Sequence, residues 1–282
     1  MRIRIPGIGV GAMGQTIRNF SAFSMKKIAF VTLFPDWIRE SLNQSMMARA
    51  EASGAVEFRV VNPRSYCYDS HRKVDDIPYG GHPGMLMKAE PVALAIESLL
   101  SVATHQRDTS LEREVGESSN RESRSGSDKP TQTKTAIILT EPSGTKFEQP
   151  QAEELASYDQ IIFVCGHYEG IDHRVEETFA THVFSIGDYV LTNGELPALV
   201  MADAVVRLLP GVLGNQDSLD EESFQNNLLG APNYTRPEVW RDQPIPEVLK
   251  SGNHSKIDKW RHAQAIERTK QRRPDLLDNK GS

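Results

Sequence analysis

Continuous apolar runs alternate with helical patterns over most of the chain. Residues 28–34 (Ile-Ala-Phe-Val-Thr-Leu-Phe) form the first such run and end at Pro35, as expected of a strand buried on both faces. The predicted elements that follow are a helix at 37–52, a strand at 56–61, a helix at 90–102, and strands at 135–139 and 160–165. Strands that alternate with helices indicate an α/β domain built on a parallel, helix-covered sheet.

Two stretches with few apolar residues interrupt this pattern. Residues 106–134 are rich in Ser, Glu and Arg and contain no aromatic residue, so we expect a disordered insertion there. Residues 214–232 include a run of carboxylates and are expected to link two domains. The sequence therefore predicts an α/β domain at 25–213 and a small C-terminal domain at 233–282.

The N-terminus carries a pattern that resembles a dinucleotide site. Residues 9–14 read Gly-Val-Gly-Ala-Met-Gly, a literal G-x-G-x-x-G. The only candidate strand before it is interrupted by Pro6 and Gly7, and no βαβ unit with an acidic ribose partner follows. A dehydrogenase is thus a distant alternative. We expect 1–24 to be a disordered extension, with an Arg-bearing transit segment as the other reading, and the true start stays open between Met1 and Met25.

Composition excludes several classes of protein. The net charge of −6 argues against a globally basic nucleic-acid binder, and no DNA partner is expected. The two cysteines, Cys67 and Cys165, form no metal-binding or disulfide pattern, so we expect a cytoplasmic protein and read Cys165 as a core residue. No run approaches the ~20 apolar residues that a membrane span needs.

The C-terminal part differs in charge from the rest. Residues 250–273 hold eight Lys or Arg against two acidic residues and follow a helical pattern. A local cationic helix can be an ordinary solvated face or a contact for nucleic acid, and charge alone leaves both open. Trp240 and Trp260 are expected to form the small core of this part.

Three loops after predicted strands are rich in glycine and polar residues: 79–85, 165–172 and 185–195. Ligands of α/β sheets bind beyond the carboxyl ends of the strands, so these loops can build one pocket. Glycine allows close approach of the backbone to a ligand, and main-chain groups can read an adenine edge. Apolar walls for a flat ring would come from Ile186, Tyr189 and Leu191.

Six segments, in one order, resemble the bacterial tRNA (guanine-N1-)-methyltransferases, a family of trefoil-knotted methyltransferases. They are 79–85, 166–172, 185–197, 210–214, 234–237 and 249–254, within a match that runs from Met25 to about Leu277. The resemblance implies a homodimer with S-adenosyl-L-methionine in a knotted domain, an all-helical C-terminal domain that grips tRNA, and methylation of N1 of guanine 37 beside the anticodon.

The same resemblance assigns residues to the site. Carried over by position, Glu169 would read the guanine. Asp188, in or near the cofactor loop, is expected to bind substrate and could instead polarise the bound cofactor, coordinate a cation or cap a turn. Mg²⁺ therefore stays open, since no ligand set can be identified. The residues expected to contact the cofactor are Gly166, Tyr168, Ile186, Gly187, Tyr189, Leu191, Gly194 and Pro197.

The reaction itself requires a base and a cation. Guanine N1 carries a proton at neutral pH, so a general base must remove it while negative charge develops on O6. The family places an arginine at the position of Arg207, and its base is an aspartate followed by Ser-Phe. Here Glu222 occupies that position, a departure that also leaves Asp220 and Glu221 as candidate bases.

Two further departures lie in the loops. His82 stands where related loops usually carry a glycine, and His167 stands where similar enzymes often carry an arginine. The rivals to this reading are a knotted methyltransferase with a different RNA target and a catalytically impaired protein that binds cofactor and RNA without turnover.

Overall fold

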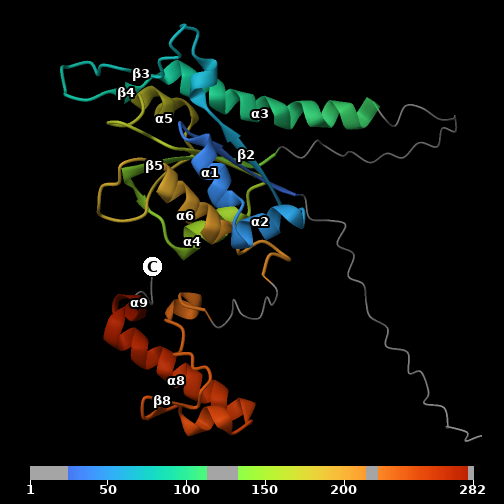
Figure 1. Cartoon of the computed structure of the whole chain (residues 1–282), viewed down its shortest axis with the longest axis vertical. Helices are drawn as coiled ribbons and strands as arrows, with labels where there is room; N and C mark the ends of the chain where they lie inside the picture. The colour runs from blue at the N-terminus through green and yellow to red at the C-terminus, as the bar shows by residue number, and fades with distance from the viewer. Residues whose placement is uncertain (1–24, 113–132, 214–221, 279–282) are drawn as a thin grey trace, which may run out of the picture.

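The computed structural model of the protein describes residues 25–112, 133–213 and 222–278 (Figure 1). Over 102–112 and at Gln225 only the backbone is described. The expected extension at 1–24 with its glycine motif, most of the expected insertion, and the candidate bases Asp220 and Glu221 lie outside the described residues.

Five parallel strands form the central sheet, in the order β2-β1-β6-β5-β7. The strands are β1 (Lys26–Val31), β2 (Val56–Val61), β5 (Thr135–Lys146), β6 (Gln160–Val164) and β7 (His182–Ser185). Because parallel neighbours need crossover connections, helices lie between the strands in the sequence and cover the sheet. The predicted α/β domain with a parallel sheet is confirmed.

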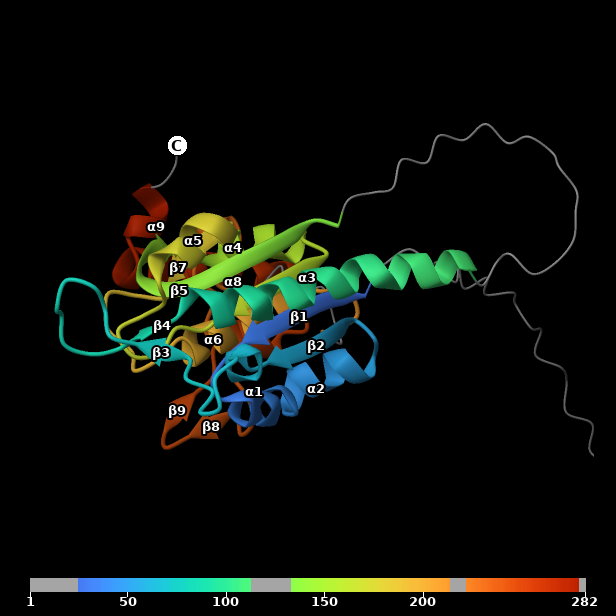
Figure 2. The ribbon, with the colours of Figure 1, turned by 90° about the horizontal axis from the view of Figure 1, so that it is seen from above.

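Helices cover both faces of this sheet. One face carries α1 (Pro35–Leu42), α2 (Ser45–Ala52), α4 (Gln149–Ala156) and α6 (Glu195–Val206), and the other carries α3 (Ala89–Glu112) and α5 (His173–Phe179). Figure 2 shows α3 lying along the sheet, with its C-terminal end projecting beyond it. The result is a three-layer arrangement with two cores, one on each side of the strands.

Alternation along the strands divides these two cores. Ile28 and Phe30 of β1 belong to one core, while Ala29 and Val31 belong to the other. Phe30 stacks on Phe163 of β6 with 5.4 Å between the ring centroids, and both rings are fully buried. The middle of β1, β5 and β6 is therefore apolar on both faces, which explains why the sequence shows continuous apolar runs there instead of strict alternation.

The helix predicted at 37–52 is two helices. Helix α1 ends where Asn43 N–H donates to Arg39 O, and Ser45 begins α2 with a φ of 47°. Leu42 and Met47 are both buried, yet five residues along a straight helix turn through ~140°. The break lets both side chains face the core, so packing overrides the continuous helical pattern.

Two elements are longer than predicted. Helix α3 continues past 102 to Glu112 and so includes the first residues of the segment that we expected to be disordered. Adding a residue to an existing helix gains one hydrogen bond, which is far easier than nucleation. Strand β5 continues past 139 to Lys146, with a register shift against β7 between Thr140 and Thr145.

A small antiparallel pair projects from the same domain. Strands β3 (Asp75–Asp76) and β4 (Leu86–Met87) flank the loop with the first glycine cluster, and the 3-10 helix η1 (Pro63–Tyr66) lies against α3. Met87 also forms a bridge with Ile171, which ties this pair to the segment after β6.

The C-terminal part is not all-helical. Its main element is α8 (His254–Arg272), accompanied by η2 (Gln225–Asn227), η3 (Glu247–Lys250) and α9 (Asp275–Asp278), and a two-stranded hairpin pairs β8 (Val239–Trp240) with β9 (Gln243–Pro244). Trp240 is 57% exposed in this hairpin, so its expected core role is wrong. Trp260 packs against Tyr234 with 6.3 Å between ring centroids.

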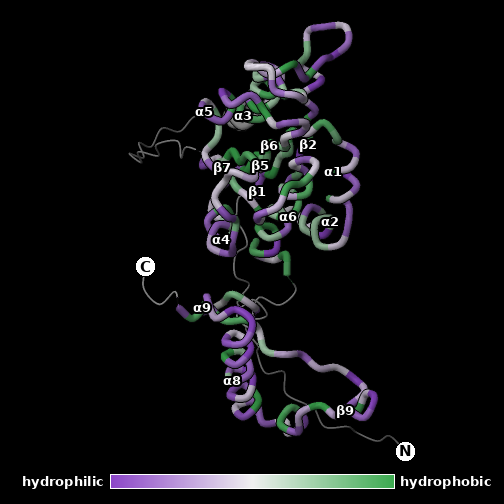
Figure 3. The backbone as a smooth tube through the Cα atoms, turned by 90° about the vertical axis from the view of Figure 1, so that its left-hand side faces the viewer, coloured by the Kyte–Doolittle hydropathy of each residue, from purple (hydrophilic) through white to green (hydrophobic). Residues whose placement is uncertain are grey.

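Figures 1 and 3 show α8 apart from the layers of the sheet domain and largely hydrophilic along its length. The pKa of Arg273 is raised by its bond to Asp275 and, to a smaller extent, by the charge of Glu148.

In the described part of the chain, no helix has both the length and the apolar character needed to cross a bilayer.

Candidate active site

Main-chain hydrogen bonds join the three glycine-rich loops. Gly194 N–H donates to Gly166 O at 2.8 Å, which links the loop after β7 to the loop after β6. Glu169 N–H donates to Met85 O at 3.0 Å, which links the loop after β6 to the loop between β3 and β4. The structure thus gathers all three loops at the carboxyl edge of the sheet, where α/β proteins bind ligands.

A pocket of about 380 Å³ opens between two of these loops. Its lining comes from residues 140–142 at the register shift of β5, from the loops after β6 and β7, and from the first residues of α5 and α6. It contains all eight residues expected to contact the cofactor: Gly166, Tyr168, Ile186, Gly187, Tyr189, Leu191, Gly194 and Pro197. The loop at 79–85 does not line the pocket but buttresses Glu169 from outside.

Gly194 is the tightest point of this pocket. A Cβ atom at this position would lie 2.7 Å from Gly166 N and 2.9 Å from Cys165 Cα, closer than real Cβ contacts. The same Cβ atom would also meet Thr140 Oγ1, which donates to Gly194 O at 3.2 Å. The two loops can therefore meet only with glycine here, which gives a physical reason for this residue at the pocket floor.

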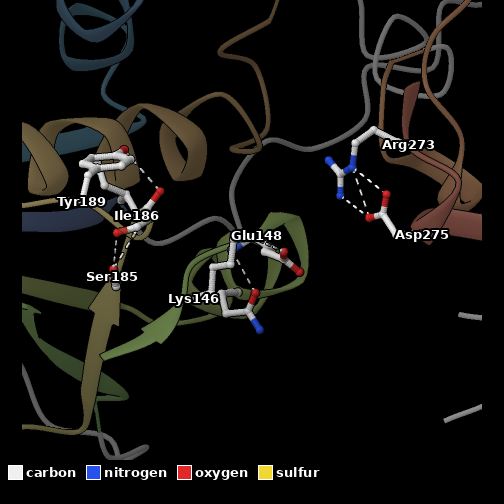
Figure 4. Close-up of polar contacts among 9 residues, drawn as sticks. Lys146, Glu148, Ser185, Ile186, Tyr189, Arg273 and Asp275 are labelled. Atoms are coloured by element: carbon white, nitrogen blue, oxygen red, sulfur yellow. Dashed lines mark hydrogen bonds and ion pairs between the residues drawn. The ribbon is translucent and has the colours of Figure 1, made fainter. Parts of the chain in front are cut away.

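The loop after β7 holds its own shape by local hydrogen bonds (Figure 4). Ser185 Oγ donates to Gly187 O at 3.1 Å, and Tyr189 Oη donates to Ile186 O at 3.4 Å. Tyr168 is held from the opposite wall by Arg64, whose Nη2 donates to the phenol oxygen at 3.3 Å. Both tyrosine rings remain partly exposed, so they can cover a flat ligand in the pocket.

The two expected substrate residues differ in position. Glu169 lines the pocket, and the backbone of Gly84 lies so close to it that a Cβ atom there would be 2.7 Å from Glu169 Oε1. Gly84 has a φ of 102°, which favours glycine. Asp188 is exposed and is not among the lining residues, so the structure does not bring it into the pocket.

Arg207 and Glu222 form a bidentate ion pair. Arg207 Nη1 donates to Glu222 Oε2 at 2.6 Å, and Nη2 donates to Oε1 at 2.6 Å. The two side chains are 29% and 34% exposed, and the bond raises the pKa of Arg207 further above its usual value. The resemblance implied that this arginine and this carboxylate act in one reaction, and in the structure the two side chains bond each other.

This pair lies at the far end of α6 from the pocket. Gly194 and Pro197 stand at the N-terminal end of this 12-residue helix, whereas Arg207 caps its C-terminal end. At 1.5 Å per residue the helix is ~18 Å long. Neither Arg207 nor Glu222 lines this pocket, so within the chain the expected base lies apart from the residues expected to contact the cofactor.

Glu222 instead borders a second cavity of about 670 Å³. Residues 226–233 form one wall and α8 forms the other, with Arg261, His262 and Arg268 among the lining residues. Arg268 Nη1 donates to Gly230 O at 3.0 Å, and Leu229 N–H donates to Thr269 Oγ1 at 2.9 Å. These bonds fasten the segment after Glu222 to the cationic helix.

The sequence analysis missed two residues of β5 and Thr32, which directly follows β1. Thr140 and Glu141 line the pocket from β5, and burial raises the pKa of Glu141 despite a hydrogen bond from Ser143. In the sequence, the feature that could have pointed to Thr140 and Glu141 was an acidic residue at the end of an apolar run. Glu195 was named only as the last residue of a loop, yet it is fully buried against Thr32.

The remaining candidates behave as ordinary parts of the domain. Cys165 is fully buried, and burial raises the pKa of its thiol well above its usual value, which suits a core residue. His82 is exposed in the loop between β3 and β4. Among the described residues, no three His, Cys, Asp or Glu side chains cluster in a way that could hold a metal ion.

Comparison with known proteins gives one consistent result. The family model described as tRNA (Guanine-1)-methyltransferase TrmD matches residues 25–279. A protein of Moorella thermoacetica named tRNA (guanine-N(1)-)-methyltransferase is 46% identical over 251 residues, which cover 89% of this chain and 90% of the relative. Proteins of the same name from Bacillus cereus and Bacillus anthracis are 45% identical over 254 residues, or 90% of this chain and 93% of each relative.

Replacement of Gly194 by Ala tests the pocket floor. The added methyl group must push Gly166 away and break the 2.8 Å bond between the loops. We expect the dissociation constant for S-adenosylmethionine, measured by isothermal titration calorimetry, to rise at least ~10-fold.

Gly166→Ala is the matched control for folding, since its Cβ would meet only Ile171 side-chain atoms at 3.7 Å or more. It should keep the melting temperature, whereas Gly194→Ala should lower it. Unchanged cofactor affinity in Gly194→Ala would show that this contact does not shape the pocket.

Proposed function

The chain belongs to the tRNA (guanine-1)-methyltransferase family, and we propose that it transfers a methyl group from S-adenosyl-L-methionine to N1 of guanine 37 in tRNA. One observation carries the proposal beyond family membership. The eight residues expected to contact the methyl donor line a single pocket of about 380 Å³, although they come from two separate loops and the first turn of α6. We further propose that the chain threads this region as a trefoil knot.

The pocket fits S-adenosylmethionine in size and in chemistry. Its walls combine Ile186, Tyr189, Leu191 and Pro197 with main-chain groups of two glycine-rich loops, a combination suited to an adenine ring. Bound there, the donor supplies an electrophilic methyl group. The chain's part is to hold donor and guanine in line, because alignment accounts for much of the rate of a displacement reaction.

The chain must also remove the proton on guanine N1. We propose that Glu222 accepts this proton and that Arg207 faces the negative charge that develops on O6. In the described state both oxygens of Glu222 accept from Arg207 at 2.6 Å. The guanine would insert into this pair, with N1–H replacing one guanidinium bond and O6 accepting the other.

Exchange of this kind preserves the number of charge-assisted bonds. A bidentate pair of an arginine and a carboxylate is strong, so opening it without a replacement is costly. The guanine offsets that cost, because its N1–H donates to Glu222 and its O6 accepts from Arg207. The exposed fractions of 29% and 34% leave both side chains within reach of an incoming base. The pair can thus hold Glu222 ready in the free protein and open when tRNA arrives.

Glutamate at this position is compatible with the role. Its intrinsic acidity is close to that of the aspartate found in the family, and one extra methylene lengthens its reach. Asp220 and Glu221 stay alternatives, since both lie outside the described residues. The proposal favours Glu222 because it is the carboxylate that Arg207 holds.

We propose that two copies of the chain complete the site. The ~18 Å length of α6 separates the pocket from the Arg207–Glu222 pair within one protomer. Apolar residues beside the pocket are exposed: Val190 is 84% exposed, and Leu196 and Val200, one turn apart on α6, are 45% and 50% exposed. A partner packed on this face would cover these residues and bring its own linker to the pocket.

The C-terminal part is proposed to hold tRNA. Helix α8 supplies Arg261, His262 and Arg268 to the cavity that begins at Glu222, so a cationic surface leads directly to the proposed base. Phosphate contacts of this kind weaken as salt concentration rises. The free thiols of Cys67 and Cys165 agree with a reducing compartment, and we propose the cytoplasm.

Two rivals remain to be tested against this proposal. A knotted methyltransferase with a different RNA target would use the same pocket but yield another nucleoside. A protein impaired by the Asp-to-Glu change would bind the methyl donor and tRNA without turnover. Both rivals share the pocket, so product analysis separates them.

Single-turnover transfer of labelled methyl groups to tRNA transcripts with G37 or A37 tests the reaction. We expect 1-methylguanosine from the G37 transcript only, identified by nucleoside analysis. A different methylated nucleoside would support the first rival, and cofactor binding without any product would support the second.

Glu222→Gln tests the proton acceptor. The amide cannot take the N1 proton, so the single-turnover rate should fall at least ~100-fold while cofactor affinity stays within about twofold. Glu222→Asp, which restores the family's residue, should retain most of the rate. Glu221→Gln is the matched control and should be near normal; a near-normal rate in Glu222→Gln would refute the assignment.

A double substitution on α6 tests the homodimer. Leu196→Glu with Val200→Glu places charge on the exposed apolar face, so light scattering should report a monomer and methyl transfer should fall at least ~100-fold. Thr178→Glu, exposed on α5 at the opposite face of the sheet, should stay dimeric and active. A wild-type protein that is monomeric at working concentrations would exclude the shared site.

A further inference from the structure

A fully buried carboxyl group lies beneath the pocket. Glu195, the first residue of α6, has no exposed surface, and its Oε1 accepts from Thr32 Oγ1 at 2.5 Å. Its Oε2 is also buried but has no hydrogen-bond partner among the described residues. Burial raises the pKa of this carboxyl, against the opposing effect of the bond from Thr32. A buried polar atom without a partner requires an explanation.

A second buried atom lacks a partner nearby. His167 Nδ1 is buried and unpaired within the described part of the chain, and His167 lines the pocket while Glu195 does not. The bond between Gly194 and Gly166 brings the residues that precede Glu195 and His167 together. The charge of His167 lowers the pKa of Glu195, a smaller effect than burial, but the two side chains form no hydrogen bond or ion pair in the described state.

Thr32 fixes the carboxyl on one side. Its oxygen accepts from Phe34 N–H at 2.9 Å, so its single hydrogen is available for Glu195. The Phe34 ring meets the His167 ring edge-on, with 5.2 Å between centroids, and His167 meets Tyr168 at 4.5 Å. The unpaired atoms of Glu195 and His167 thus lie on adjoining segments between the end of β1 and the pocket wall.

We propose that Glu195 is a positioning residue: when the methyl donor enters the pocket, the free carboxyl oxygen of Glu195 and His167 Nδ1 come to share one proton, and this bond holds the loop at 166–170 in its donor-bound conformation. One proton satisfies both atoms, whether a neutral imidazole donates to a carboxylate or a protonated carboxyl donates to the imidazole. The proposal rests on the proposed function, because it assigns the 166–170 loop to the donor pocket.

The other titratable group that faces Glu195 does not compete for this bond. Cys165 directly follows β6. Burial raises the pKa of its thiol well above the usual value, and the charge of Glu195 raises this pKa to a smaller extent. The thiol is therefore neutral and a weak donor at best. Among the described residues, His167 is the partner that can satisfy the carboxyl and also line the pocket.

A double-mutant cycle tests the bond. The variants are Glu195→Leu, Glu195→Gln, His167→Ala and both His167→Ala double variants, each measured for the dissociation constant of S-adenosylmethionine and for the single-turnover rate at saturating donor. His173→Ala serves as the coupling control, since His173 lines the same pocket but is 71% exposed in its side chain and bonds to Glu176. Melting temperatures report whether each variant folds.

We expect Glu195→Leu and His167→Ala each to raise the dissociation constant at least ~10-fold, and the double variant to be no worse than either. Glu195→Gln, whose amide can donate to Nδ1, should stay within about threefold of the wild type. In a variant that carries both Glu195→Leu and His173→Ala, the two fold increases in the dissociation constant should instead multiply.

Losses that multiply for Glu195→Leu and His167→Ala would overturn the proposal, as would a Glu195→Gln variant as impaired as Glu195→Leu. If Glu195→Leu does not fold, Glu195→Gln takes its place in the cycle. The proposal would then be overturned if Glu195→Gln weakens donor binding more in the His167→Ala background than in the wild type. Failure here leaves the function intact when the wild type forms 1-methylguanosine, whereas a wild type without that product defeats the function itself.

Discussion

The contact between Gly194 and Gly166 is the constraint on which the site depends. Five parallel strands bring their carboxyl ends to one edge, and the loops after β6 and β7 must then lie backbone to backbone to enclose a pocket. No side chain fits between them, because even a methyl group at Gly194 would lie 2.7 Å from Gly166 N. Every proposed donor contact follows from that approach, and α6 begins at the next residue, so the same contact also fixes the direction in which the helix leads to Arg207.

Charge is distributed so that the two ends of α6 behave differently. At its beginning, Glu195 is buried and tied to β1 through Thr32, an arrangement that is costly to disturb because a buried charge or polar group cannot fall back on water. At its end, Arg207 and Glu222 are about one-third exposed, so a base that offers one donor and one acceptor can replace their mutual bonds. The proposed reaction would use a rigid donor pocket and an adjustable proton acceptor, since the donor must be aligned before the guanine arrives.

Much of the fold and of the pocket could be predicted from the sequence, for identifiable reasons. The strands of the sheet are buried on both faces, so their apolar runs are unmistakable, and the glycine loops with their neighbours stand out against them. The break between α1 and α2 could not be predicted, because only the packing of Leu42 and Met47 against one core requires it. Nor could the sequence show that Glu195 is buried, that Asp188 stays outside the pocket lining, or that Arg207 bonds Glu222, since each depends on contacts between distant segments.

In the proposed mechanism the Arg207–Glu222 pair opens to receive the guanine at a pocket that two protomers complete. A crystal structure of the protein with tRNA and a non-reactive analogue of S-adenosylmethionine measures this directly. We expect a Glu222 carboxylate oxygen within ~3 Å of guanine N1, with Arg207 at O6 and the analogue in the pocket of the other protomer. An intact bidentate Arg207–Glu222 pair, with guanine N1 facing a different carboxylate, would contradict it.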